Sequence, residues 1–110
     1  MDRSLLDGHV LVDQLSALAS PHRLRIVAVL RRDGRQYVSE LARRVGMSRP
    51  LLYLHLEKLE AAGFVRSELS LSDDGKALKW FEVCDFELTL SPDLIVAAAV
   101  SITDHKERTN

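Results

Sequence analysis

Residues 39–62 read SELARRVGMSRPLLYLHLEKLEAA, and their apolar spacing predicts two helices joined by a short turn. The segment from Ser39 to Val45 has the apolar spacing of a short helix. A break of three residues, Gly46-Met47-Ser48, follows, in which glycine can end one helix in a left-handed turn and serine can cap the next. Apolar residues then recur at i, i+4 and i+7 over a longer helix from Arg49 to about Ala62, at Leu52, Leu56 and Leu59. Two helices joined by such a turn predict a helix-turn-helix over about residues 39–62.

Two more helices are expected before this motif. Leu11, Leu15 and Leu18 share one helical face over residues 9–19. Ser20-Pro21 then suits the start of another helix, because serine caps it and the first turn does not use the N–H that proline lacks. We expect this second helix to end near Asp33-Gly34.

After the motif, the apolar period changes from helical to two. Val65, Leu69 and Leu71 alternate with polar residues, which predicts a strand with one buried face. Residues 72–75, Ser-Asp-Asp-Gly, predict a hairpin turn, and residues 76–84 the returning strand. Together they predict a β-hairpin, or wing, over about residues 64–84.

A last helix is predicted over about residues 92–105, where Ser91-Pro92 repeats the cap-and-proline start. The whole order is then α-α-α-α-β-β-α in one domain over residues 1–110, mainly α with a β-hairpin (α+β). This is the order of a winged helix-turn-helix. In that fold the second helix of the motif enters the major groove of double-stranded DNA, and the hairpin reaches the flanking backbone.

The charge distribution agrees with a DNA partner, although the formal net charge is only −1. Residues 21–66 carry ten Lys and Arg against four Asp and Glu, and both flanks are acidic. A basic segment that coincides with the helix-turn-helix favours nucleic-acid binding. An enzyme is not expected, because the domain is small and its four histidines are not arranged with a nucleophile or a carboxylate pair.

Other features bound the cellular setting. The N-terminus lacks the basic-then-apolar order of a signal peptide, and the longest uncharged apolar stretch, Leu94 to Thr103, is too short to span a bilayer. We therefore expect a cytoplasmic protein with no membrane partner. Cys84 is the only cysteine, which excludes an intrachain disulfide and a CxxC zinc site, and we expect it to be a packing residue.

Four stretches together resemble the ArsR/SmtB family of bacterial winged-helix repressors. They are LASPHRLRI at 18–26, SELA at 39–42, VGMS at 45–48 and HLEKLEAAGFV at 55–65. The resemblance covers residues 10–84 well and the last helix more loosely. It implies a homodimeric transcriptional regulator, in a family of which many members sense metals.

The start of the helix over residues 49–62 is the expected DNA-reading surface. Arg49 is the expected guanine reader, because its fork matches two acceptors in the major groove. The full set of expected DNA-contacting residues is Ser48, Arg49, Tyr53, His55, Lys58, Arg66, Lys76 and Lys79. Alternatives stay open for Ser48, as a helix cap only, and for His55, as a partly buried packing residue; His22 is expected to be structural.

Two departures from the family pattern affect this prediction. Leu51 and Leu54 stand where the family usually has polar DNA-facing residues, so they pack either on thymine methyl groups or on another apolar surface. The wing tip, Asp73-Asp74, is acidic and would repel phosphate. The alternative function is therefore a protein-interaction module on a winged-helix scaffold, with weak or no DNA binding.

The last helix predicts a subunit interface, because it has almost no polar face. A small core can bury only one side of such a helix, which favours a homodimer in which the first helix joins the last. The residues expected at the interface are Leu11, Leu15, Leu94, Ile95, Ala98, Ala99 and Ile102.

Metal binding is predicted only in part. The family's thiolate site is absent, since Tyr37 and Ser39 stand at its positions. A second family site pairs ligands of the last helix across the dimer; Asp93 and His105 match it, whereas Ile95 and Arg108 replace the other ligands. Asp93, Asp104, His105 and His9 form the candidate set for zinc or nickel, against the alternative of a solvated tail. With the set incomplete, an effector or co-regulator protein remains a further expected partner.

Overall fold

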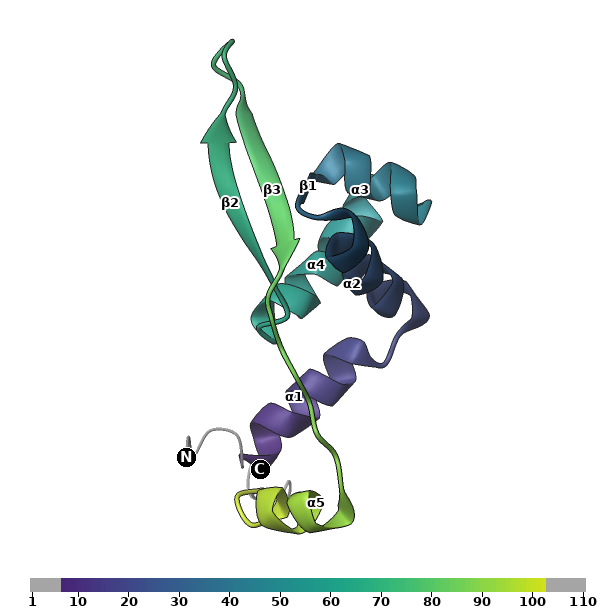
Figure 1. Cartoon of the computed structure of the whole chain (residues 1–110), viewed down its shortest axis with the longest axis vertical. Helices are drawn as coiled ribbons and strands as arrows, with labels where there is room; N and C mark the ends of the chain where they lie inside the picture. Colours follow the sequence, from purple (N-terminus) through teal and green to yellow (C-terminus); the bar gives the residue numbers. More distant parts are fainter. Residues whose placement is uncertain (1–6, 103–110) are drawn as a thin grey trace, which may run out of the picture.

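In the computed structural model, residues 7–102 are described, and they form an elongated molecule of 52 × 33 × 25 Å (Figure 1). The elements in order are α1 (Gly8–Leu18), α2 (Pro21–Asp33), β1 (Gln36–Tyr37), α3 (Val38–Val45), α4 (Arg49–Ala61), β2 (Val65–Leu71), β3 (Ala77–Val83) and α5 (Pro92–Ala99). The predicted α+β class and winged helix-turn-helix order are confirmed, and β1 is an addition. Among residues 7–102, no helix has the length and apolar character needed to cross a membrane.

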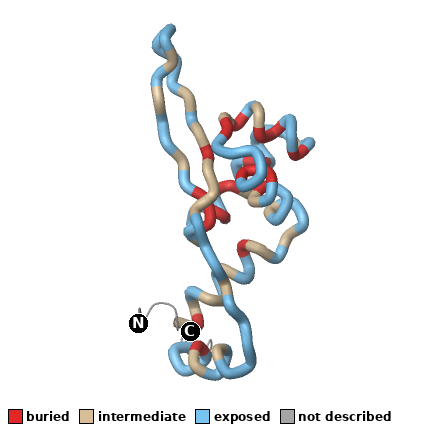
Figure 2. Tube along the Cα trace, viewed as in Figure 1, coloured by how far each residue is buried: buried red, intermediate tan, exposed pale blue. Residues whose placement is uncertain are grey.

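The core lies where α2, α3 and α4 meet the base of the wing (Figure 2). Its largest fully buried side chains are Phe64, Phe81, Ile26, Leu30, Leu41, Leu52, Leu56, Leu59 and Val65. The predicted i, i+4, i+7 leucines of α4 are among them, so that α4 is fixed to the body along one side. Its opposite side is left facing outward.

The turn between α3 and α4 forms as its residues require. Gly46 has φ 70°, a left-handed conformation that few other residues adopt, and its N–H donates to Ala42 O at 2.9 Å. Ser48 then caps α4 by accepting the Leu51 N–H on its side chain at 3.3 Å. The local sequence therefore sets both the end of α3 and the start of α4.

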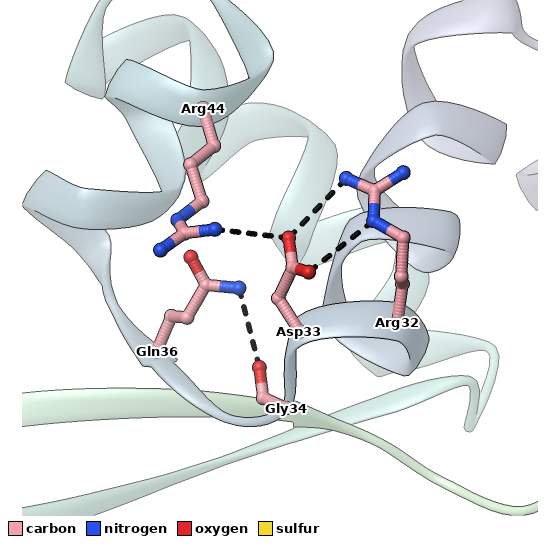
Figure 3. Close-up of polar contacts among 5 residues, drawn as sticks. All are labelled: Arg32, Asp33, Gly34, Gln36 and Arg44. Carbon is pink, nitrogen blue, oxygen red and sulfur yellow. Dashed lines mark hydrogen bonds and ion pairs between the residues drawn. The ribbon is translucent and has the colours of Figure 1, made fainter.

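An acidic residue at the end of α2 ties α3 to the body (Figure 3). Asp33 accepts hydrogen bonds from its neighbour Arg32 and, across the corner, from Arg44 at 3.0 Å. The hydrogen bond from Arg32 lowers the pKa of Asp33. Beside this cluster the buried Gln36 donates to Gly34 O at 3.2 Å, which supports the turn into β1.

The wing belongs to a three-stranded antiparallel sheet in the order β1-β3-β2. The two-residue strand β1 was not predicted, because so short an extended segment carries no periodic pattern. On one face of the sheet Tyr37 stacks on Trp80 with ring centroids 3.7 Å apart, and Arg35 lies over the Trp80 ring at 4.4 Å. These contacts join the wing to the segment that leads into α3.

One expectation for the wing is wrong. Val65 is buried, but Leu69 and Leu71 are 68% and 75% exposed, so the strand has no continuous buried face. The reason is geometric: the hairpin extends beyond the helices, and only its base has a core to pack on (Figures 1 and 2).

The opposite end of the molecule is formed by α5 and the start of α1, which pack together, whereas Ala17 near the end of α1 joins the main core (Figure 1). Gly8 N–H donates to Ser101 Oγ at 2.7 Å, and Ser101 Oγ donates to Ala98 O at 3.0 Å. A Cβ on Gly8 would lie 2.5 Å from Ala98 O and closer still to Ile102, so only glycine permits this approach.

The predicted length of the last helix is also wrong within the described residues. α5 ends at Ala99, and residues 100 and 101 form a turn. Residues 99–102, Ala-Val-Ser-Ile, include no glycine, proline or charged residue, so the sequence carries no clear signal for the end of the helix. Asp93 lies on α5, which ends at Ala99, whereas His105 lies outside the described residues.

Candidate nucleic-acid interface

The outward side of α4 presents the residues that the sequence predicted to read DNA. Arg49 and Tyr53 are exposed at its start, and Leu54 is exposed in its second turn. Ser48 is exposed as well, although its hydroxyl oxygen is engaged as the cap. The orientation follows from the buried leucines on the opposite side, since a helix fixed along one side must present the other.

A groove lies between the start of α4 and the inner face of the wing. It is lined by Tyr37, Val38, Ser39, Arg49, Tyr53, Leu69, Ala77, Leu78 and Lys79. Tyr53 packs edge-on against Phe81 at 6.3 Å, and Lys79 Nζ lies 5.5 Å from the same ring. Phe81 thus supports one aromatic and one cationic side chain on the two walls of the groove.

Ion pairs reduce the number of cations available to a ligand. Among the described residues the pairs are Arg31–Asp85, Arg32–Asp33, Arg35–Glu68, Arg44–Asp33 and Arg66–Glu82. Apart from Arg23, some Lys and Arg side chains within residues 7–102 belong to none of these ion pairs. They are Arg25, Arg43, Arg49, Lys58, Lys76 and Lys79. Arg66, a predicted DNA contact, is therefore partly neutralised, since its Nε lies 3.0 Å from Glu82. Arg43 is an exposed cation on α3 that is not among the DNA contacts expected from the sequence.

His55 lies on a different side of α4 from the groove. Its Nδ1 accepts from Arg23 Nη1 at 3.0 Å, and its ring centroid is 5.4 Å from that of His22. Arg23 Nε also donates to Ala17 O at 2.6 Å, so this one side chain connects α1, α2 and α4. Burial lowers the pKa of His55, and the charges of Arg23, His22 and Lys58 lower it further. The structure thus places His55 in a contact between helices, which agrees with the alternative that it is a partly buried packing residue.

The dimer candidates fall into two groups in the structure. Leu15 and Ile95 are exposed, and Leu11 and Leu94 are half-buried beside a groove between α1 and residues 86–89. Ala98, by contrast, is only 2% exposed, because it packs against Gly8 of the same chain. Val96 and Val100 are more exposed, at 68% and 85%, and were not singled out. Ala99 and Ile102 are exposed.

The metal candidates are not brought together in the part of the chain that the structure describes. No group of three or more His, Cys, Asp or Glu side chains within residues 7–102 has the geometry to hold an ion. His9 lies at the start of α1 and Asp93 in the first turn of α5, whereas Asp104 and His105 lie outside the described residues. Cys84 is half-buried just after β3, where its N–H donates to Phe64 O at 2.9 Å.

Comparison with known proteins identifies the family. A family model described as a helix-turn-helix domain matches residues 18–68. An uncharacterized HTH-type transcriptional regulator from Methanocaldococcus jannaschii is 33% identical over 79 residues, covering 72% of this chain and 81% of that protein. The chain belongs to the helix-turn-helix family of transcriptional regulators. This confirms the helix-turn-helix transcriptional regulator that the resemblance to the ArsR/SmtB family implies.

Solved structures of the same fold support the winged arrangement. HlyU from Vibrio cholerae matches with a TM-score of 0.58 at 22% identity, over 91% of this chain and 92% of that one. Reduced HlyU from the same organism matches with a TM-score of 0.55 at 20% identity, over 93% and 92% of the two chains. At this identity the likeness concerns the fold alone. For this helix-turn-helix regulator, α4 is the second helix of the motif and hence its recognition helix.

Proposed function

We propose that this regulator binds a specific DNA operator as a homodimer, with α4 in the major groove. The observation that carries the proposal is the position of Arg49: it is exposed in the first turn of α4, beside the wing groove, and outside all ion pairs of the described residues. A guanidinium in this position can donate to O6 and N7 of one guanine. An arginine paired with a carboxylate would have to break that ion pair before it could bind DNA.

The wing contacts the DNA backbone only through residues of β3 and of the turn that precedes it. Lys76 and Lys79 belong to β3 and its approach, and Lys79 lies on the groove wall that faces Arg49. The tip itself is acidic at Asp73 and Asp74, so phosphate contact is confined to the stem. Contacts restricted to so few cations predict a modest affinity, and because these contacts are electrostatic the affinity should fall as the salt concentration rises.

The apolar surface at the other end of the molecule supports a homodimer. Val12 and Leu15 of α1 and Ile95, Val96 and Val100 of the α5 region are exposed, which is unusual for a monomer. A two-fold dimer would cover this surface and present two α4 helices to half-sites about one helical turn of DNA apart. Sedimentation is expected to show a dimer that Val96→Glu dissociates, with Leu71→Glu on the exposed wing as the matched control.

Regulation by a metal or by a partner protein stays a prediction of the sequence. Two of the four candidate ligands, Asp104 and His105, lie outside the described residues. The contacts of residues 7–102 favour neither zinc nor nickel over a separate effector.

The test of operator binding is selection of a duplex from a randomised pool by the full chain, followed by footprinting. We expect a protected site with two related half-sites about ten base pairs apart, centre to centre. A chain that enriches no sequence, or that binds every duplex equally, would overturn the proposal.

A further inference from the structure

We propose that Leu51 and Leu54 recognise thymine through its C5 methyl group, so that apolar contacts specify part of the operator. This inference rests on the proposed function, because it concerns which base pairs α4 distinguishes. It chooses between the two partners, thymine and another apolar surface, that the sequence leaves open for these residues.

The two leucines form an apolar patch on the outward side of α4. Leu51 is 41% and Leu54 is 58% exposed, whereas Leu52 between them is fully buried. Residues three apart in a helix are neighbours on its surface, so the two side chains lie next to each other. We call them the leucine pair.

The position of the leucine pair favours DNA as the partner. Both residues belong to the first two turns of the recognition helix, the part that reaches base edges in this motif. Arg49 precedes the pair and Lys58 follows it by one turn, and neither cation belongs to an ion pair of the described residues. The pair therefore follows a residue proposed to read a base edge and precedes a cation that can reach phosphate, a position in which it can contact base edges in the major groove.

The surroundings of the pair do not suit a stable protein interface. Such interfaces bury on the order of 1,000 Å² or more with an apolar centre. Here the next turn of the same helix carries the charged residues Glu57 and Lys58, both exposed. Two leucines bordered so closely by charge offer too little apolar area for that purpose.

The chemistry then selects the base. Leucine has no hydrogen-bonding group, so it cannot distinguish donors from acceptors, and the thymine methyl is the apolar group that the four bases display in the major groove. Burying one methyl group is expected to strengthen binding about fourfold. Leu54 lies about 7.5 Å along the helix axis from Arg49, which places the thymine within about three base pairs of the guanine.

Deoxyuridine tests the inference, because it removes only the methyl group and keeps every hydrogen bond of the base pair. Each thymine of the selected duplex is replaced singly, and affinity is measured by fluorescence anisotropy. We expect about fourfold weaker binding at one or two thymines per half-site. Leu51→Ala or Leu54→Ala should abolish this sensitivity at one of those positions, while the control Leu71→Ala, at a wing leucine outside the groove, should retain it at all of them.

The outcomes separate the inference from the function on which it rests. If the chain binds its selected duplex tightly but no thymine-to-deoxyuridine change matters, the leucine contacts are wrong and operator binding stands. If methyl sensitivity survives in both leucine variants, another residue reads thymine and the inference is again wrong. If no duplex is selected at all, the proposed function itself fails, and the inference fails with it.

Discussion

Arg23 and His55 form a polar contact between α2 and α4, and Arg23 extends it to α1. The guanidinium of Arg23 can only donate, so Nδ1 of His55 must be the acceptor and the neutral ring carries its proton on Nε2. Protonation of His55 would turn that acceptor into a donor facing a cation. The contact between α2 and α4 therefore requires the neutral histidine.

A pH dependence of stability follows from this contact. Burial holds the pKa of His55 below its ordinary value of 6.5, so the unfolded chain binds the proton more readily than the folded one. The free energy of unfolding should therefore fall as the pH drops below about 6.5, and it should level off once the folded-state pKa has been passed. Urea unfolding at pH 7.5 and 5.5 measures this loss. His55→Gln should reduce it more than the neighbouring His22→Gln, which removes only one of the charges that lower the pKa of His55; equal losses in wild type and His55→Gln would refute the assignment.

At the scale of single elements, the start of α4 must serve both stability and recognition. Ser48→Ala removes the cap and is expected to cost about 1 kcal/mol of unfolding free energy. Ser48→Asp keeps a good cap and suits the positive end of the helix dipole, but it adds a negative charge where DNA is expected. Thermal unfolding and anisotropy together should show a stable Ser48→Asp variant with weakened DNA binding. A Ser48→Asp variant that binds DNA as the wild type does would mean that the start of α4 does not face the phosphates.

The packing of α5 on α1 makes a second prediction at this scale. Gly8→Ala places a Cβ 2.5 Å from Ala98 O, and the backbone must move to relieve this clash. We expect a loss of about 1 to 3 kcal/mol, despite the better helix propensity of alanine. Ser101→Ala, which removes only the hydroxyl that accepts from Gly8, should cost about 1 kcal/mol. Chemical denaturation distinguishes the two; a Gly8→Ala variant as stable as wild type would show that the two helices do not pack as described.

At the scale of the whole molecule, salt dependence measures how many cations reach phosphate. The logarithm of affinity should fall linearly with the logarithm of salt concentration, by about 0.9 for each phosphate neutralised. Lys79→Ala should make this slope shallower by about one for each copy of the residue that contacts DNA. Arg31→Ala should not change it, because Arg31 pairs with Asp85 of the segment after β3. A slope near zero between 50 and 200 mM salt would contradict phosphate contact altogether.

Much of this architecture could be predicted from the sequence, because its signals are local. Gly46 and Ser48 define the turn, and the periodic leucines define α4, without reference to the rest of the chain. The predictions that depended on distant contacts did less well. Leu69 and Leu71 alternate as if buried, yet the hairpin extends past the body that would cover them.

In the candidate site, too, features set by the local sequence were predictable and features set by distant contacts were not. The exposure of Arg49 and Tyr53 follows from helix periodicity and was predictable. The neutralisation of Arg66 by Glu82 and the approach of Arg23 to His55 were not, because each joins residues far apart in the sequence. The close contact of Gly8 with Ala98 likewise joins residues far apart in the sequence, and no local sequence pattern indicates it.

Specific binding to the operator is proposed to depend on Arg49 at the start of α4. The most direct test of this claim compares the affinities for the selected duplex and for a scrambled duplex of equal composition, in wild type, Arg49→Ala and Arg31→Ala. We expect wild type and Arg31→Ala to prefer the selected duplex strongly, and Arg49→Ala to lose about 1 to 3 kcal/mol of that preference for each half-site. An Arg49→Ala variant that discriminates between the two duplexes as well as the wild type does would contradict the claim.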